Sequence, residues 1–282
     1  MGKSILFLHG LGGSGDDWDQ VIPLFEACGW RCEAPTLFQH LRTRQTPPEA
    51  LDNLGFNDWI KASAAYAEHL TNEEGEKPLV IGHCIGGLVA QKLVEYGDVS
   101  GGVFISPTPD AASHITGRKL SKSLNFSAFL LTMRANNSPL RSVGLGWGML
   151  NNVASHERAA IIENMRYESS RLSSELANPL SIPGQTSRVT TQEVNVPTMT
   201  ITCGKDRAIS KSTVQLTAAN WTKAKTVGLS LTFPNIGHWP FKEVGSETMF
   251  SSVLEWANTV ECIKTRPAMP RKTAKIISLS AA

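Results

Sequence analysis

Five short runs of the chain have the apolar and β-branched residues of strands. They are SILFLHG at 4–10, PLVIG at 78–82, GGVFISP at 101–107, VPTMTITCGKD at 196–206 and GLSLTFPNIGHWP at 228–240. Such runs are typical of strands covered on both faces, and WRCEAPTL at 30–37 is a further candidate. Apolar residues recur at helical spacing near 18–25, 59–70, 85–93 and 249–257. This alternation predicts an α/β fold with a mostly parallel sheet flanked by helices.

The alternation is interrupted between about Pro107 and Val194. No comparable strand pattern occurs there, and helical pieces are predicted at 125–135 and 146–172. We interpret this stretch as a helical insertion within one α/β domain. The expected organisation is a core of 1–107 and 194–262, a helical cap of 108–193, and a basic, flexible C-terminal tail of 263–282.

The stretch LVIGHCIGGLVAQ at 79–91 predicts a strand, a tight turn and a helix. Gly82-His83-Cys84-Ile85-Gly86 has the spacing of a nucleophile elbow, whose central residue lies in a strained turn. Side chains at the two glycine positions would meet neighbouring backbone. The turn lifts the Cys84 thiol above the sheet edge, and it places the Ile85 N–H at a helix N-terminus, where negative charge is stabilised.

Three other segments place candidate chemistry just after strands. HGLGG at 9–13 follows the first strand, and the N–H of Leu11 is a candidate second donor to an oxyanion. Asp206 follows a late strand, and His238 follows the next one. Because the C-terminal ends of parallel strands share one edge of a sheet, these positions can converge on Cys84. The order nucleophile, acid, base is that of the α/β-hydrolase fold.

In HGLGG, GHCIGG, CGKD and GHWP the chain resembles a cap-bearing α/β-hydrolase, over about residues 5–260. The resemblance implies a nucleophile Cys84, a general base His238 and an orienting acid Asp206, with oxyanion donors Leu11 and Ile85. It also implies that the insertion forms a cap over the site. The departure is the cysteine, because most of the family has Ser there. Dienelactone hydrolases and some thioesterase-like members use Cys.

Alternatives to these assignments stay open. Asp110 and Glu243 are rivals of Asp206 as the acid. By the same resemblance, His83 is a structural residue of the turn. Cys84 is alternatively a structural thiol in a non-catalytic, ligand-binding member of the fold, or an engineered replacement of Ser.

A thiol nucleophile narrows the expected substrates. Cysteine attacks as the thiolate, which a neighbouring imidazolium and a helix N-terminus stabilise. The acyl-enzyme is then a thioester, so attack on another thioester is nearly balanced and attack on an alkyl ester runs uphill. We expect a small-molecule acyl substrate bound to CoA or a carrier protein, or an activated ester or lactone. Hydrolysis and transfer to another nucleophile, including macrolactone or lactam formation, remain alternatives.

Apolar residues of the insertion could form a roof over an acyl chain or pack between the helices of the cap. They are Phe126, Phe129, Leu130, Met133, Trp147 and Met149.

The composition of the chain says little about its chemistry, but it excludes some classes of partner. The chain has 282 residues, of which 41% are hydrophobic and 18% charged, as in ordinary globular proteins. No apolar run is long enough to cross a membrane. The segment 263–282 carries five basic residues and no acid, so the rest is acidic overall despite the net charge of +2, and we expect no nucleic-acid partner. Five cysteines without a secretory signal or metal-ligand spacing indicate a cytoplasmic protein with reduced thiols, no metal and no cofactor.

Overall fold

A computed structural model describes residues 2–111 and 139–265 of the chain. Its strands form one six-stranded sheet in the order β2-β1-β3-β4-β5-β6, and every neighbouring pair is parallel. The strands are β1 (Ser4–Leu8), β2 (Arg31–Glu33), β3 (Leu79–His83), β4 (Gly101–Ile105), β5 (Thr198–Cys203) and β6 (Leu229–Phe233). The predicted α/β fold is confirmed. β2 is shorter than the run at 30–37, which contains Pro35, a residue with no N–H to extend the ladder.

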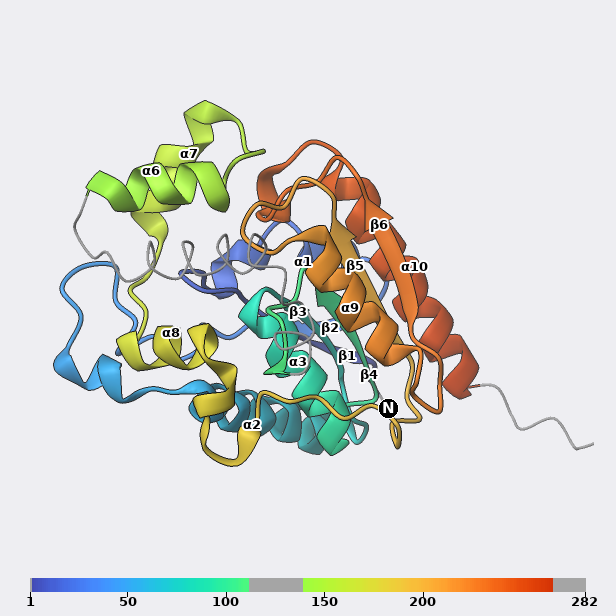
Figure 1. Cartoon of the computed structure of the whole chain (residues 1–282). Coiled ribbons are helices and arrows are strands. Elements are labelled where there is room, and N and C mark those ends of the chain that lie inside the picture. The colour runs from blue at the N-terminus through green and yellow to red at the C-terminus, as the bar shows by residue number, and fades with distance from the viewer. Residues whose placement is uncertain (1, 112–138, 266–282) are drawn as a thin grey trace, which may run out of the picture.

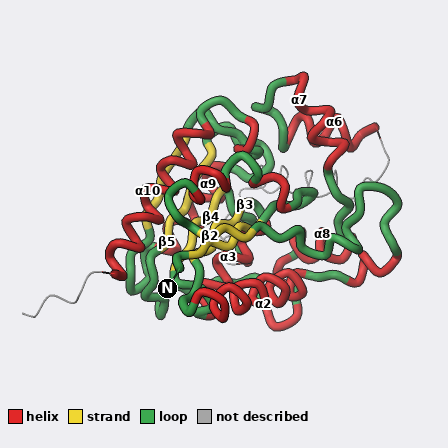
Figure 2. Tube along the Cα trace, turned by 180° about the vertical axis from the view of Figure 1, so that it is seen from behind, coloured by secondary structure: helices red, strands yellow, loops and turns green. Residues whose placement is uncertain are grey.

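Helices cover both faces of the sheet, as Figures 1 and 2 show. Those that pack on it are α1 (Ile22–Glu26), α2 (Phe56–Glu74), α3 (Ile85–Tyr96), α9 (Lys211–Trp221) and α10 (Ser246–Thr265). On one face α2 contacts α3, and the Trp221 indole of α9 donates a hydrogen bond to Gln91 of α3. On the other face α1 contacts α10. The helix predicted over 18–25 is in fact two pieces, a 3₁₀ turn at Gly15–Trp18 and the short α1.

Aromatic side chains fill the layer on each side of the sheet. The ring of Phe7 in β1 lies 4.9 Å from Trp18 and 5.4 Å from Phe25. The ring of Phe104 in β4 lies 5.0 Å from Trp221 of α9. Successive residues of a strand point to opposite faces of the sheet. Apolar residues at consecutive positions therefore give both faces an apolar layer, which holds the strands and the loops that follow them in place.

The described part of the insertion contains three helices, α6 (Pro139–Gly148), α7 (Ser155–Asn164) and α8 (Ser170–Ala177). In Figure 1, α6 and α7 stand away from the sheet, whereas α8 lies beside α2 and contacts it. The helix predicted over 146–172 is therefore wrong as a continuous element. Residues 165–169 are extended, because their backbone bonds to core loops instead: the N–H of Arg166 donates to Gly12 and that of Tyr167 to Thr43.

Other predictions for the insertion and the tail are only partly covered. The piece 125–135, with Phe126, Phe129, Leu130 and Met133, lies outside the described residues. Met149 is buried and Trp147 is half exposed, so the roof over an acyl chain stays a prediction. α10 continues to Thr265, beyond the start expected for the tail. None of the helices in the described ranges is long and apolar enough to span a bilayer.

Candidate functional site

The loops that follow β1, β3, β5 and β6 meet at one edge of the sheet. After β5, the N–H of Lys205 donates to the carbonyl of Ile236, which tethers two of these loops. The Nε2–H of His83, at the end of β3, donates to the carbonyl of His238 over 2.7 Å. The parallel topology and these contacts bring together positions that lie 155 residues apart in the chain.

Cys84 occupies the strained turn that the glycine spacing predicts. Its φ of 56° and ψ of −120° lie outside the usual regions for a residue with a side chain. A Cβ on Gly82 would lie 2.1 Å from the carbonyl oxygen of Gly86. A Cβ on Gly86 would lie 2.4 Å from that of Leu8. The two glycines are therefore required by close backbone approach, and the turn leads straight into α3.

Asp206 and His238 are paired, and both side chains are fully buried. The Nδ1 of His238 lies 2.7 Å from the Oδ2 of Asp206, whose other oxygen accepts the N–H groups of Ala208 and Ile209. Burial alone would lower the pKa of His238. The Asp206 carboxylate and the Cys84 sulphur, through charge and hydrogen bonding, outweigh it and raise that pKa to about 10. The Asp206 carboxylate and the Cys84 sulphur thus both favour the protonated form of the ring.

The two rival acids make other hydrogen bonds. Asp110 accepts the N–H of Val189, at 3.3 Å. Glu243 accepts the N–H of Gly237 and the amide of Asn152, so it braces the loop that carries the histidine. Asp206 is the carboxylate that the structure pairs with the imidazole.

His83 packs under His238, with ring centroids 4.9 Å apart. Burial and the neighbouring His238 cation hold its pKa well below the usual value, so the ring is neutral. A neutral ring with its proton on Nε2 is the form that donates to the carbonyl of His238. Its contacts are those of a residue that supports the histidine loop.

The two predicted oxyanion donors follow β1 and β3 at this edge of the sheet. Leu11 and Ile85 are fully buried, and within the described residues neither N–H donates a hydrogen bond. Ile85 is the first residue of α3, whose N–H has no partner within the helix. Such N–H groups can donate hydrogen bonds to an oxyanion and stabilise its negative charge.

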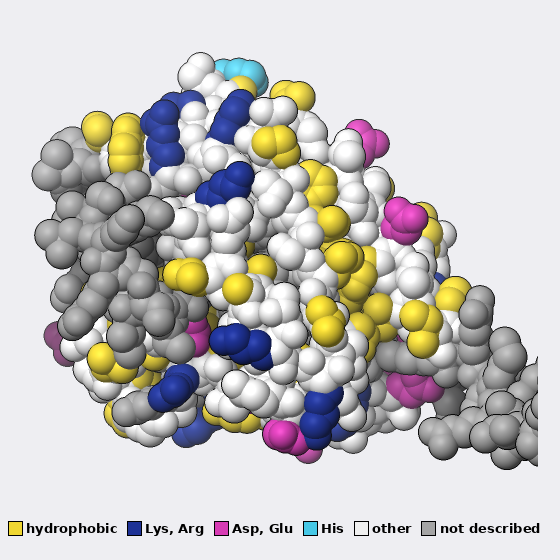
Figure 3. Space-filling model, turned by 45° about the vertical axis from the view of Figure 1, so that its right-hand side comes forward, with side chains coloured by type: hydrophobic (Ala, Val, Ile, Leu, Met, Phe, Trp, Pro, Cys, Tyr) yellow, Lys and Arg dark blue, Asp and Glu magenta, His cyan; other side chains and the backbone are white. Residues whose placement is uncertain are grey.

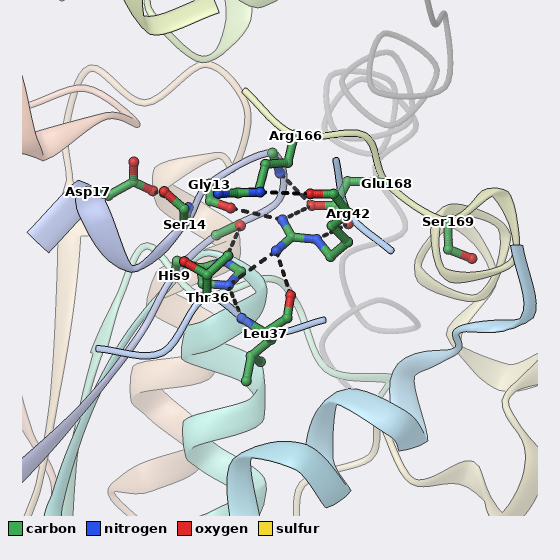
Figure 4. A network of polar contacts seen from close by, with 12 residues as sticks. His9, Gly13, Ser14, Asp17, Thr36, Leu37, Arg42, Arg166, Glu168 and Ser169 are labelled. Carbon is green, nitrogen blue, oxygen red and sulfur yellow. Dashed lines mark hydrogen bonds and ion pairs between the residues drawn. The ribbon is translucent and has the colours of Figure 1, made fainter. Parts of the chain in front are cut away.

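Several polar residues of this edge were not predicted from the sequence. The Thr108 hydroxyl lies 3.7 Å from the Cys84 sulphur, and its N–H donates to the Cys84 carbonyl. A buried network around Arg42 and Glu168 holds the loop at 10–13 (Figure 4). Arg42 lies in a stretch that looks like a polar loop, and Glu168 in a predicted helix. No local pattern in one sequence connects residues 126 positions apart.

A pocket of 530 Å³ opens beside the site. Gly12 and Trp239 line it from the core, each adjacent in sequence to a predicted site residue, and Ile161 and Met165 line it from the insertion. The charged side chains that line it include Asp16, Arg44, Glu157 and Lys242. On the face shown in Figure 3, hydrophobic side chains are scattered among Lys, Arg and uncharged ones.

Among the described residues, no three His, Cys, Asp or Glu side chains form a cluster that could hold a metal ion. All five cysteines are free thiols; Cys28 and Cys262 are exposed, whereas Cys84 and Cys203 are buried. Cys203 ends β5, and burial raises the pKa of its thiol. It is a buried residue of the strand.

Comparison with known proteins gives a family and a fold. A family model described as the alpha/beta hydrolase family matches residues 5–248. An Arabidopsis methylesterase is 14% identical with a TM-score of 0.62, over 91% of this chain and 99% of its own. Tomato methylketone synthase I, complexed with 2-tridecanone, is 16% identical with a TM-score of 0.64, over 92% and 99%. A monoacylglycerol lipase from Paleococcus ferrophilus is 16% identical with a TM-score of 0.58, over 92% and 97%. At such identities the structural likeness shows the fold alone.

Proposed function

The chain belongs to the alpha/beta hydrolase family, and from that premise we propose that it is an acyl-processing hydrolase with Cys84 as its nucleophile. The observation that carries the proposal is the buried Asp206–His238 pair beside the strained turn of Cys84. The Nδ1 of His238 lies 2.7 Å from Asp206, and that carboxylate, together with the Cys84 sulphur, raises the pKa of the ring. An imidazolium in contact with sulphur is the group that stabilises a reactive thiolate.

In the first half of the reaction, the thiolate attacks the acyl carbon. The new carbon–sulphur bond pushes the carbonyl electron pair onto oxygen, and the N–H groups of Leu11 and Ile85 bind that oxyanion. When the tetrahedral intermediate collapses, the bond to the leaving group breaks and His238 gives its proton to that group. Asp206 holds the ring in the tautomer that this transfer requires.

In the second half, neutral His238 takes a proton from water as the water attacks the thioester carbon. Collapse releases the carboxylic acid and returns the Cys84 thiolate beside the imidazolium. The sum is hydrolysis of the acyl compound by one water molecule.

The thioester intermediate supports a choice of substrate. A thiolate displaces another thiolate with little change in free energy, so acyl groups on CoA or on a carrier protein suit the site, as do activated esters and lactones. The pocket beside Gly12 and Trp239 offers apolar lining from Ile161 and Met165, which suits an acyl chain. Relatives named as a methylesterase and a lipase are consistent with acyl chemistry.

Intact-protein mass spectrometry with a panel of acyl thioesters and p-nitrophenyl esters tests this proposal. We expect an adduct on Cys84 that hydroxylamine removes and that Cys84→Ala lacks. Cys262→Ala, which removes an exposed thiol, should keep the adduct and the turnover. If the protein gives neither turnover nor a labile adduct across the panel, the proposal fails and a ligand-binding role replaces it.

Burial of the site favours a second candidate, an acyltransferase or a macrolactone- or lactam-forming cyclase on the same residues. Cys84 and His238 are both fully buried, and a dry site favours a bound acceptor over water. Product analysis with competing amine and alcohol acceptors separates the two. Hydrolysis alone under every acceptor excludes transfer.

A further inference from the structure

The loop at 10–13, called the oxyanion loop below, makes a tight turn beside Cys84. The N–H of Gly13 donates to the carbonyl of Gly10 over 3.2 Å, and Gly12 has a φ of +74°. A positive φ at the third position is what a type II turn requires, and glycine takes it without strain. Leu11 is the second residue of this turn, and its N–H is left for the substrate oxygen under the proposed function.

The other peptide groups of the oxyanion loop are bound by charged residues from two distant segments, as Figure 4 shows. The N–H of Gly12 donates to Oε1 of Glu168 at 2.6 Å. The carbonyl of Gly12 accepts the N–H of Arg166 at 2.9 Å, and that of Gly13 accepts Nη2 of Arg42 at 2.9 Å. Glu168 and Arg166 come from the extended segment between α7 and α8, so the insertion supplies two of the three contacts.

Glu168 and Arg42 form a bidentate ion pair that is shut off from solvent. Their side chains are 1% and 0% exposed, and the Nε and Nη2 groups of Arg42 each donate to a different carboxylate oxygen. The remaining Nη1 donates to the Leu37 carbonyl and lies 3.3 Å from Nε2 of His9. Every N–H of the guanidinium therefore has an acceptor, and its planar geometry fixes the position of the Glu168 carboxylate.

We propose that Glu168 is a positioning residue for acyl transfer, which binds the Gly12 N–H and so sets the turn that presents the Leu11 N–H to the oxyanion. The inference rests on the proposed function and adds a residue of the insertion to it. Glu168 does not touch the reacting atoms. Its carboxylate holds one peptide of the oxyanion loop, and Arg42 balances the charge that would otherwise be buried alone.

Two reactions at the same sulphur separate this role from general damage. Acylation by a p-nitrophenyl ester passes through an oxyanion, whereas alkylation by iodoacetamide displaces iodide and forms none. In Glu168→Gln we expect acylation of Cys84 to fall at least tenfold, with KM nearly unchanged and alkylation within about twofold of the wild type. Equal losses in both reactions, or no loss in either, would overturn the proposal.

Glu175→Gln is the matched control. Glu175 lies on α8, is also buried, and makes contacts of the same two kinds, with a backbone N–H at 2.6 Å and an arginine at 2.9 Å. The N–H that it binds belongs to Phe56 at the start of α2, and not to the oxyanion loop. We expect both reactions of this variant to stay within about twofold of the wild type. A tenfold loss of acylation in it would show that any such carboxylate suffices, and would overturn the proposal.

A charge-neutral pair of variants avoids an unpaired buried guanidinium. Arg42→Met/Glu168→Gln keeps an oxygen that can accept the Gly12 N–H, and Arg42→Met/Glu168→Met does not. We expect the first to acylate at least several-fold faster than the second, and equal rates would contradict the role. If the wild type alkylates but never acylates, the proposed function has failed. Hydrogen exchange of the oxyanion loop then decides, because Glu168→Gln must speed it and Glu175→Gln must not.

Discussion

Replacing Asp206 by Asn removes the carboxylate charge from the histidine and tests the thiolate–imidazolium pair directly. The Nδ1–Oδ2 distance is 2.7 Å, which puts the two charge centres about 4 Å apart. At an effective dielectric constant of about 20, that attraction is about 4 kcal/mol. One pKa unit corresponds to about 1.4 kcal/mol, so the pKa of His238 should fall by roughly three units from its value of about 10. The equilibrium between the thiolate–imidazolium pair and the neutral thiol–imidazole pair then shifts toward the neutral pair by up to about 10³-fold.

Alkylation of Cys84 by iodoacetamide reads this out, because only the thiolate reacts. At pH 7 we expect Asp206→Asn to react between about tenfold and about 10³-fold more slowly than the wild type. The sign follows from His238: its ring is protonated below a pKa of about 10, and a ring that loses its proton at lower pH no longer stabilises a thiolate. The pH of half-maximal alkylation should therefore rise by up to about three units. Because the same buried sulphur is compared in both proteins, its limited access cancels.

Two controls are built into this assay. The exposed Cys28 and Cys262 react in the same sample and should keep their rates. Asp110→Asn removes a buried carboxylate that follows β4 and does not pair with the histidine, so it should leave the profile unchanged. An unchanged profile in Asp206→Asn, or a shifted one in Asp110→Asn, would refute the assignment of the acid.

Four further changes have defined outcomes. Cys84→Ala should abolish acylation and lower the pKa of His238, because the thiolate that raises it is gone; an NMR titration of the ring measures this. Gly86→Ala should destabilise the protein by about 3 kcal/mol or more in urea unfolding, because the new Cβ falls 2.4 Å from a backbone oxygen. Gly146→Ala, where a Cβ meets nothing within 4 Å, should instead be stabilising by about 0.5–1 kcal/mol, and a loss would contradict the steric argument. Glu168→Met should cost about 3–5 kcal/mol by leaving a buried guanidinium unpaired; an unfolding midpoint like that of the wild type would contradict it.

The sheet and its elbow were predictable because their determinants are local. A strand that is covered on both faces must be apolar within a few residues. The glycines at 82 and 86 are required by backbone atoms at 2.1 and 2.4 Å, all within a few residues or on the adjacent strand. Parallel topology then dictates that loops at strand C-termini share an edge, which is enough to place Cys84 near Asp206 and His238. Their roles in a reaction remain a proposal.

The polar network could not be predicted from the sequence for the opposite reason. Arg42 lies in LRTRQTPPEALDNLGFND, where polarity and two prolines indicate an exposed loop. It is fully buried only because Glu168, 126 residues away, balances its charge. The continuous helix predicted over 146–172 fails at the same place. Residues 165–169 give up intrahelical bonds for bonds to Gly12 and Thr43, and a local pattern carries no information about such partners.

These contacts bear on how separable the core and the expected cap are. Glu168 and Arg166 bind the oxyanion loop, Glu175 binds the start of α2, and Lys92 of α3 donates to the carbonyl of Arg188. A core cut free of residues 108–193 would lose all four contacts and would leave Arg42 buried without a counter-charge. The insertion is therefore part of what holds the oxyanion loop, and a change that shifts the segment between α7 and α8 must reach the loop beside Cys84. A cap that only covered the pocket, without these contacts, could shift without displacing the oxyanion loop.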